Sequence, residues 1–239
     1  MLTGSVVPRL LAAACMLVSQ FAFAEDLVSV YTGTSFTRNS DLHLRQGASG
    51  TDLLLHDVHW DAKPFSDAPY YGLRLTRFFD RNPQWGVALD FTHYKMIADT
   101  GRTVAASGTW KGAPAGANVR MDQYVQQFEI SHGVNMLSLN GMRRWSGLSG
   151  WQPYVGLGLV YYRPHAESTV DQRSHATGYQ SSGFGYQMLG GVQYPLAARW
   201  LVFAEAKFNR GRARVDIEDG HARTPLRTFH LVGGVHYSF

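Results

Sequence analysis

The last twelve residues, Thr228–Phe239, read TFHLVGGVHYSF and alternate between two kinds of side chain. One set is apolar or aromatic apart from a glycine, and the other is mostly small or polar. The first set is Phe229, Leu231, Gly233, Val235, Tyr237 and Phe239, and the second is Thr228, His230, Val232, Gly234, His236 and Ser238. A period of two residues is typical of a β-strand whose two faces meet different surroundings.

The same alternation recurs along the chain, and the polar face carries charges in the middle of the strand. Asp90 lies on the polar face of 84–95, and Glu205 and Lys207 lie on that of 199–211. A membrane barrel has this pattern because lipid surrounds it and its interior is polar. The segments that fit are about 27–37, 68–79, 84–95, 133–144, 152–163, 179–194, 199–211 and 226–239.

These eight segments predict an all-β fold, an eight-stranded antiparallel transmembrane up-and-down β-barrel of the bacterial cell outer membrane. Short connectors at one end and long ones at the other are typical of such barrels. The four long, polar connectors are predicted to be extracellular loops, at about 38–67, 96–132, 164–178 and 212–225. Eight strands enclose a space that side chains fill, so we expect no wide solute pore.

Composition excludes several other classes of protein. The 239 residues are 45% hydrophobic, 13% aromatic and 17% charged, which is not the composition of a disordered chain. The longest apolar run, Leu10–Val18, is too short to cross a bilayer as a helix. The formal net charge of +4 is too small to indicate a nucleic-acid partner.

The first 24 residues predict a cleaved signal peptide, which leaves 25–239 as the barrel. Arg9 is followed by the apolar run and then by Ala22-Phe23-Ala24, which has the small-residue spacing of a cleavage site. Cys15, the single cysteine, leaves a lipoprotein site as the alternative. At the other end, a strand that finishes on Phe239 resembles the signal read by the barrel assembly machinery, which is therefore an expected partner.

Charged residues on the polar faces predict a network inside the barrel. If Asn82 centres the turn after the second segment, Phe79 faces Trp85 and Arg74 faces Asp90, with both charges pointing inward. Glu205 and Lys207 belong to the same predicted interior network. Buried charges need partners of opposite sign, so a structural role is sufficient to explain these four residues.

The first long connector is rich in groups that can bind metals or transfer protons. It contains His43, His56, His59, Asp52, Asp57, Trp60 and Asp61, and leads into Pro69-Tyr70-Tyr71. Phe91–Lys95 emerges at the same end of the barrel. The spacing His56-x-x-His59 matches no specific metal motif, so no metal site is predicted. The chain also has no nucleophile elbow, phosphate-binding loop or dinucleotide fingerprint, and no cofactor is evident.

Several motifs resemble the outer-membrane lipid A oxidases of rhizobia and related β-barrel proteins. They occur in order, with similar spacing, over about 60–239. They are Trp60-x4-Phe65-x3-Pro69-Tyr70-Tyr71-Gly72-x-Arg74, Trp85-Gly86-x3-Asp90-Phe91-x-His93-x-Lys95 with Ala98-Asp99, Arg143-Arg144-Trp145, Pro153-Tyr154-Val155-Gly156-x-Gly158-Leu159, Pro164-His165 and Phe203-x-Glu205-x-Lys207.

This resemblance implies oxidation of the proximal glucosamine of lipid A to 2-aminogluconate by oxygen, with release of peroxide. Outer-membrane lipid and lipopolysaccharide would then be the partners. The candidate catalytic residues are His93, Asp61 and Tyr70, and the candidate substrate-binding residues are Trp60, Arg74 and Lys95. His93 could take a proton from the sugar hydroxyl, and Arg74 or Lys95 could hold a lipid A phosphate.

A second interpretation comes from a different class of protein. A small barrel without enzymatic activity could stabilise the envelope or display its loops for adhesion. The two interpretations differ in one observable, since only an enzyme changes the mass of lipid A. A narrow channel is disfavoured because an eight-stranded barrel is filled by its own side chains.

Overall fold

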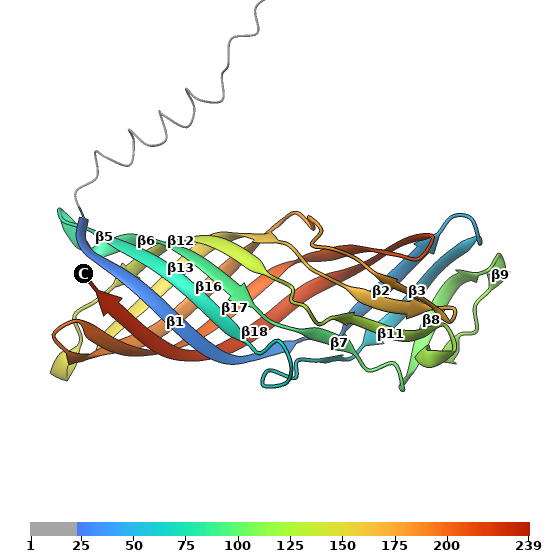
Figure 1. Ribbon diagram of the computed structural model, residues 1–239, viewed down its shortest axis with the longest axis horizontal. Coiled ribbons are helices and arrows are strands. Elements are labelled where there is room, and N and C mark those ends of the chain that lie inside the picture. The colour runs from blue at the N-terminus through green and yellow to red at the C-terminus, as the bar shows by residue number, and fades with distance from the viewer. Residues whose placement is uncertain (1–22) are drawn as a thin grey trace, which may run out of the picture.

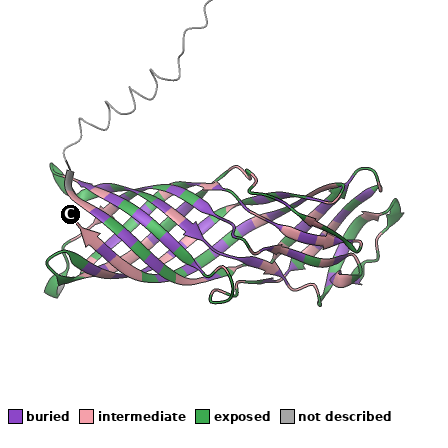
Figure 2. Cartoon of the chain, in the orientation of Figure 1, coloured by how far each residue is buried: buried purple, intermediate pink, exposed green. Residues whose placement is uncertain are grey.

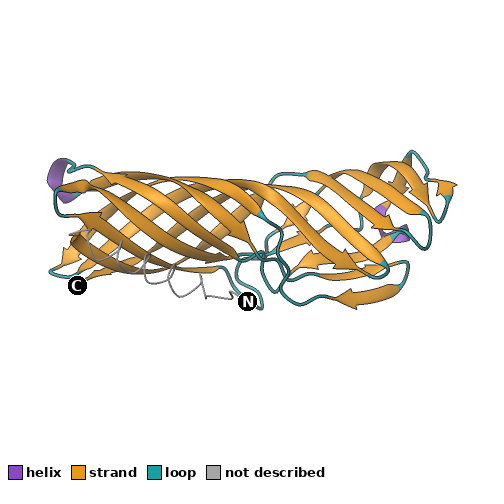
Figure 3. Ribbon diagram, turned by 90° about the horizontal axis from the view of Figure 1, so that it is seen from above, coloured by secondary structure: helices purple, strands orange, loops and turns teal. Residues whose placement is uncertain are grey.

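The computed structural model describes residues 23–239, and almost all of its regular structure is β-strand (Figures 1 and 3). Eight strands form an antiparallel barrel in the order β1-β5-β6-β12-β13-β16-β17-β18, which closes where β18 pairs with β1. Each predicted segment overlaps one of these strands, so the predicted eight-stranded barrel is confirmed. Their bounds are β1 (Phe23–Thr37), β5 (Tyr71–Phe79), β6 (Asn82–His93), β12 (Met136–Arg144), β13 (Gln152–Tyr162), β16 (Phe184–Ala197), β17 (Trp200–Ile217) and β18 (Gly220–Ser238).

The hairpin of β5 and β6 has the predicted register over most of its length. Arg74 lies opposite Asp90, as the sequence predicted. Phe79, however, pairs with Asn82 and not with Trp85, because the register shifts between the last two residues of β5. The irregularity leaves Pro83, Gln84 and Trp85 of β6 without partners on β5, and the alternation pattern alone does not reveal it.

Side chains along the barrel strands alternate between exposed and buried (Figure 2). The exposed set is apolar and includes Leu73, Leu75, Val87, Leu89, Leu137, Leu139, Leu157, Leu159, Met188 and Leu231. The buried set between them is largely polar and includes Ser29, Thr76, Thr92, Ser138, Asn140 and Gln187. In a soluble protein the apolar side chains are buried and the polar ones are exposed, and here the distribution is reversed. A barrel in lipid requires this distribution, which gives the molecule an apolar outer band.

The two ends of the barrel differ. At the turn end, short connectors join β5 to β6, β12 to β13 and β16 to β17, and β1 begins where β18 finishes. Aromatic pairs line this end, with ring centroids 4.9 Å apart in Trp151–Tyr194 and 5.0 Å apart in Trp200–Tyr237. Such rings are typical of a membrane interface. The opposite end, from which the long connectors leave, is called the loop end below.

Beyond the loop end the long connectors are built as strands. One group extends the barrel sheet from β18 in the order β2-β3-β8-β10, with β9 on β8, and the other is a five-stranded sheet, β15-β14-β11-β7-β4. We call both groups the extramembrane sheets. Their bounds are β2 (Ser40–Gln46), β3 (Thr51–Val58), β4 (Trp60–Asp61), β7 (Met96–Ala98), β8 (Thr103–Trp110), β9 (Ala113–Pro114), β10 (Asn118–Arg120), β11 (Val125–Ile130), β14 (Glu167–Val170) and β15 (Arg173–Ala176).

The extramembrane sheets contain apolar side chains that are buried as in a soluble domain. These include Leu42, Leu44, Leu53, Leu55, Val104, Met121, Phe128, Ile130, Val215 and Ile217. The sequence predicts polar loops here because charged and other polar residues separate the apolar ones, yet the apolar residues recur at every second position in these strands. The connector 212–225 is not a loop either, since β17 and β18 continue through it.

The described residues contain two short 3-10 turns, η1 (Met121–Gln123) and η2 (Leu148–Gly150). In this part of the chain no helix is long and apolar enough to cross a bilayer. Residues 1–22, which hold Cys15 and nearly all of the predicted signal peptide, lie outside the described residues.

Candidate functional site

Four charged side chains from three strands meet inside the barrel. Arg74 donates from Nη1 to Glu205 Oε2 and from Nη2 to Glu205 Oε1, both at 2.7 Å, and Nη2 also donates to Asp90 Oδ2 at 2.9 Å. Lys207 Nζ donates to the same Asp90 oxygen at 2.8 Å. The Tyr31 hydroxyl accepts from Lys207 at 2.7 Å and donates to Asp90 Oδ1 at 2.5 Å. We call these five residues the interior network.

The charged side chains of the interior network are at most 1% exposed. Removing a charge from water costs several kcal/mol unless opposite charges and hydrogen bonds compensate. The two cations, Arg74 and Lys207, contact the two carboxylates of Asp90 and Glu205, and these contacts offset the cost of desolvation. Arg74 was also a candidate for holding a lipid phosphate, and the structure places its guanidinium inside the barrel, where it donates to two carboxylates and faces away from lipid.

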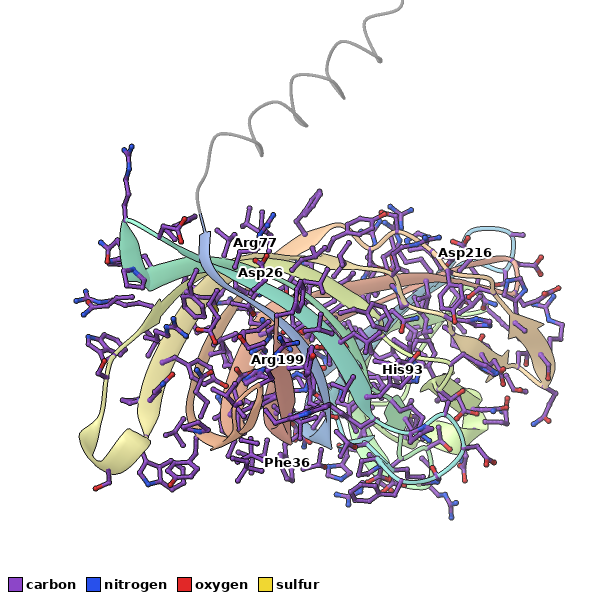
Figure 4. The ribbon with its side chains drawn as sticks, turned by 60° about the vertical axis from the view of Figure 1, so that its left-hand side comes forward. Asp26, Phe36, Arg77, His93, Arg199 and Asp216 are labelled. Carbon is purple, nitrogen blue, oxygen red and sulfur yellow. The ribbon has the colours of Figure 1, made fainter. Side chains whose placement is uncertain are left out.

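His93 is the last residue of β6 and lies where the barrel meets the extramembrane sheets (Figure 4). Its Nδ1 is 2.9 Å from Asn135 Oδ1, a contact that favours a hydrogen on Nδ1. Nε2 has no hydrogen-bond partner. The imidazole stacks on Tyr71, with ring centroids 4.9 Å apart. A Cβ on Gly133 would lie 2.3 Å from His93 Nδ1, and the φ of Gly133 is +105°, so this position requires glycine.

Next to His93 a pocket of about 420 Å³ opens on the outer wall of the barrel. It is lined by Tyr71, Phe91, Asn135, Leu137, Tyr161, Arg163 and Tyr179. We call it the wall pocket. The register explains how it forms, because Phe91 lies opposite Leu137 and Leu137 lies opposite Tyr161 on neighbouring strands. The aromatic and aliphatic side chains belong to the apolar band.

The upper margin of the wall pocket is polar. Asn135 precedes β12 and Arg163 follows β13, and the Arg163 amide donates to the Asn135 carbonyl at 2.9 Å. The Arg163 guanidinium lies 6.0 Å from the ring centre of Tyr179. The pocket thus has apolar side chains below and a cation and an amide above. A phosphorylated lipid has the matching arrangement, with acyl chains below and a charged headgroup above.

The other predicted site residues are not gathered at this pocket. Trp60 is buried, and its Nε1 donates to Ser40 Oγ at 2.9 Å. Asp61 is exposed on β4. The Tyr70 hydroxyl is buried and lies 3.1 Å from His230 Nδ1. Of the predicted catalytic residues, the structure places only His93 beside the wall pocket.

Lys95 anchors the connector that leads into β5. Its Nζ donates to Ser66 Oγ at 2.6 Å and to the Asp67 carbonyl at 2.5 Å. Burial lowers the pKa of Lys95, and the nearby Asp67 partly offsets this shift. These contacts give Lys95 a structural role at this position.

The histidines of the first connector are spread over the surface of the extramembrane sheets. His43 Nε2 is 2.5 Å from Asp52, His56 Nε2 is 3.0 Å from Ser107, and His59 Nδ1 is 3.1 Å from Asn39. Each ring has its own partner, on a neighbouring strand for His43 and His56 and in the connector between β1 and β2 for His59. His59 Nε2 also lies 3.6 Å from Asp61 Oδ1, and Asn39 links His59 to Asp57. His43 and His56 contact other partners, so the three histidines do not share one site.

Sequence reasoning missed a cluster of potential metal ligands. His132, His165 and Glu167 each offer one ligand atom, and these atoms lie within 4.8 Å of one another. His132 Nδ1 is 3.0 Å from Glu167 Oε1, and the two imidazoles are stacked 4.6 Å apart, so the exposed His132 ring must turn before both nitrogens can reach one ion. Burial and the neighbouring His132 lower the pKa of His165, which favours the neutral form that binds metals.

This cluster adjoins the wall pocket, because His165 packs edge-on against Tyr179 with ring centroids 5.1 Å apart. Nothing in the spacing of the sequence indicated it. The residues come from two connectors that meet because β11 pairs with β14 and because the His165 amide donates to the Gly133 carbonyl.

No protein-family profile matches the chain, and no curated protein matches its sequence. Solved structures do match its fold. The outer membrane protein OprG from Pseudomonas aeruginosa aligns with a TM-score of 0.53 and 14% identity, over 92% of this chain and 98% of that one. A major outer membrane protein from Thermus thermophilus aligns with a TM-score of 0.47 and 14% identity, over 90% and 100% of the two chains.

Neisserial surface protein A aligns with a TM-score of 0.45 and 12% identity, over 90% of this chain and 97% of that one. Identities this low indicate a shared fold and no particular activity. The chain has the fold of an outer-membrane β-barrel, as the sequence predicted.

Proposed function

We propose that this protein is an outer-membrane enzyme that modifies lipid A and that the wall pocket is its substrate site. The observation that carries the proposal is the position of the pocket. It opens on the lipid-facing wall at the loop end, with Phe91 and Leu137 in its apolar part and Arg163 at its polar margin. In barrels with short turns on one side and long connectors on the other, the long connectors face the cell exterior, where lipid A lies.

In this proposal each part of the pocket has one task. The apolar wall contacts acyl chains, and Arg163 makes charge-assisted hydrogen bonds to a phosphate. His93 is the proposed base, and Asn135 orients its ring. Its Nε2 is buried, and Tyr71, which stacks on the imidazole, lines the pocket, so this role requires the Tyr71 ring to move aside for the substrate. Asn135 is then a positioning residue that acts through His93.

The reaction we propose is the one that the motifs of the lipid A oxidases imply. The proximal sugar is oxidised at C1 after its phosphate has left. The C1 hydroxyl gives its proton to His93, C1 loses its hydrogen, and oxygen takes up two electrons and two protons to become hydrogen peroxide. Water then opens the lactone to the acid, 2-aminogluconate.

Ground-state oxygen accepts electrons singly, so this chemistry calls for a redox-active centre. His132, His165 and Glu167 offer two imidazoles and a carboxylate beside the pocket, a donor set that suits iron and copper. We include a metal at this cluster in the proposal, and a chelator tests it separately from the lipid site.

The test is mass spectrometry of lipid A from a host that lacks this modification and whose lipid A has lost the phosphate of the proximal sugar, with and without the gene, under aerobic growth. The wild type is expected to give a lipid A species one oxygen heavier than the dephosphorylated form. His93→Gln is expected to abolish it. His56→Gln, a partly exposed histidine on the extramembrane sheets, is the matched control and should leave it unchanged.

A second candidate function is that of a non-enzymatic barrel that stabilises the envelope or mediates adhesion. The compensated interior network and the buried apolar side chains of the extramembrane sheets favour it, since both rigidify the molecule. Unchanged lipid A, with the wild-type protein folded in the membrane and oxygen present, would overturn the enzyme proposal and leave this function.

A further inference from the structure

A row of arginines lies on the outer face of the β17–β18 hairpin, beyond the apolar band. Arg210 lies opposite Arg227, and Arg214 lies opposite Arg223. Arg212 lies between them on β17 and faces Pro225. All five arginines are exposed. We call these five residues the arginine ladder.

The arginine ladder has no carboxylate partners among the described residues. None of its five guanidinium groups forms an ion pair within 4.0 Å of an Asp or Glu side chain, unlike Arg102, Arg120 and Arg173, which pair with Asp99, Asp122 and Asp219. Like charges directly opposite each other on a sheet are destabilising. Folding alone therefore does not explain two opposed arginine pairs on one hairpin.

The acidic residues that border the ladder already have partners. Asp216, the next outward residue of β17, accepts from Gln180 Nε2 at 2.5 Å. Asp52 accepts from Arg45 and contacts His43. Asp41 lies 3.5 Å from His56. None of these carboxylates forms an ion pair with the ladder, so its guanidinium groups are available to a ligand from outside the chain.

Part of the ladder borders a groove of about 510 Å³. Arg212 and Arg214 line it from β17, and Arg223 lines it from β18. Asp41 and His43 close its far side, and Leu54 and Pro225 are among its apolar lining. Three guanidinium groups around one hollow suit an anion with several oxygens, because each can form two parallel hydrogen bonds to a phosphate or carboxylate.

The position of the ladder just beyond the apolar band indicates which anion it meets. Directly below it Phe208 pairs with Phe229, and Phe229 and Leu231 are exposed in the apolar band. From Arg210 to Arg214 the strand is about 13 Å long, at roughly 3.3 Å per residue, and a tilt of about 35–45° makes this about 10 Å along the barrel axis. The ladder therefore starts where acyl chains end and covers the depth of a phosphorylated headgroup and the first acidic sugars above it.

We propose that the arginine ladder binds the phosphate and carboxylate groups of one lipopolysaccharide molecule in the outer leaflet. The barrel order places β17 and β18 on the side opposite β6 and β12, which form the wall pocket. The ladder is therefore a second lipid contact, separate from the proposed substrate site. This proposal does not depend on whether the protein is an enzyme.

The experiment measures binding of purified lipopolysaccharide to the full-length protein refolded in nanodiscs. The test variant is Arg212→Gln/Arg214→Gln/Arg223→Gln. The matched control is Arg102→Gln/Arg120→Gln/Arg173→Gln, which removes the same charge from arginines that already have carboxylate partners. We expect the test variant to bind at least about tenfold more weakly, a difference of about 1.4 kcal/mol, and the control to bind as the wild type does.

Dephosphorylated lipopolysaccharide, which keeps its carboxylates, should bind the wild type more weakly than intact lipopolysaccharide does and should show a smaller difference between the wild type and the test variant. This comparison separates the phosphate contribution from that of the carboxylates and acyl chains. A highly sulfated polysaccharide that binds the ladder as tightly as lipopolysaccharide would overturn the assignment of the ligand. Equal losses in both triple variants would also overturn the proposal, since net charge alone would then explain binding.

Folding of each variant is checked by its heat-modifiable electrophoretic mobility. If the test variant does not fold, the salt dependence of binding by the wild type still tests the proposal. Ionic contacts at an exposed surface weaken as the salt concentration is raised. Binding of lipopolysaccharide that does not change between low and high salt would overturn the proposal.

Discussion

Arg74 and Asp90 lie directly opposite each other on β5 and β6, and the guanidinium donates to the carboxylate at 2.9 Å inside the barrel. Both side chains are almost fully enclosed. This pair links the register of one hairpin to Glu205 and Lys207 on the far wall. The interior network therefore ties β5 and β6 to β17 across the lumen.

Replacing Arg74 with Met should destabilise the barrel by about 3–5 kcal/mol, because a buried carboxylate is left without its partner. Urea unfolding in lipid vesicles, followed by heat-modifiable mobility, measures the change. Arg74→Met/Glu205→Met should recover part of the loss, since Asp90 and Lys207 still neutralise each other. Arg102→Gln, an exposed arginine, should have no measurable effect. A single variant as stable as the wild type would contradict the structural role of the network.

Replacing Gly133 with Ala should displace the His93 ring, because the added Cβ would lie 2.3 Å from Nδ1. Its φ of +105° is also unfavourable for alanine. The contact with Asn135 would be lost and lipid A modification with it, while the barrel still folds. Gly178→Ala is the control, since its added Cβ has nothing within 4 Å. Full modification by the Gly133 variant would show that the position of His93 does not matter.

Replacing Leu137 with Trp should fill the wall pocket without disturbing the core, since Leu137 is 45% exposed on the lipid face. Loss of lipid A modification with unchanged unfolding is the expected result. Leu75→Trp places the same ring on an exposed position of β5 outside the pocket and should remain active. If the two variants behave alike, the wall pocket is not the substrate site.

Acidification should destabilise the protein through His165. Burial and then the neighbouring His132 lower its pKa, so the unfolded chain binds a proton at higher pH than the folded chain does. Stability therefore falls as the pH drops through the ordinary histidine range near 6.5 and on through the lowered pKa. Titration of the His165 ring by NMR should show a pKa below 6.5, and His132→Gln should raise it. A pKa that does not move in this variant would show that the two rings do not interact electrostatically.

The alternation of side chains was enough to predict the barrel, because apolar residues recur at every second position in each strand that has one face in lipid. It also predicted that Arg74 faces Asp90, since register along a hairpin follows from its turn. The register shift between Asn82 and Gly86 was missed, because it changes pairing without changing the pattern. The strands at Leu42–Leu44 and Leu53–Leu55 were missed because these alternations are short and lie among charged residues.

The candidate site was only partly predictable. His93 was singled out from the sequence, but its neighbours were not. Asn135 and Arg163 come together through strand pairing, and Gly133 matters because of one backbone angle. His132 and Glu167 meet through the pairing of β11 with β14, which brings together connectors that are distant in the sequence. Contacts of this kind depend on register between segments, which one sequence does not specify.

The pairing of β1 with β18 also has a consequence for how the molecule is made. The first and last strands of the barrel share eleven pairs, Leu27↔Ser238 through Thr37↔Thr228. The ring cannot close until the final strand has been synthesised, so earlier intermediates expose two unpaired strand edges, which are templates for aggregation. Shortening the chain by one strand would thus produce an insoluble product and not a smaller barrel.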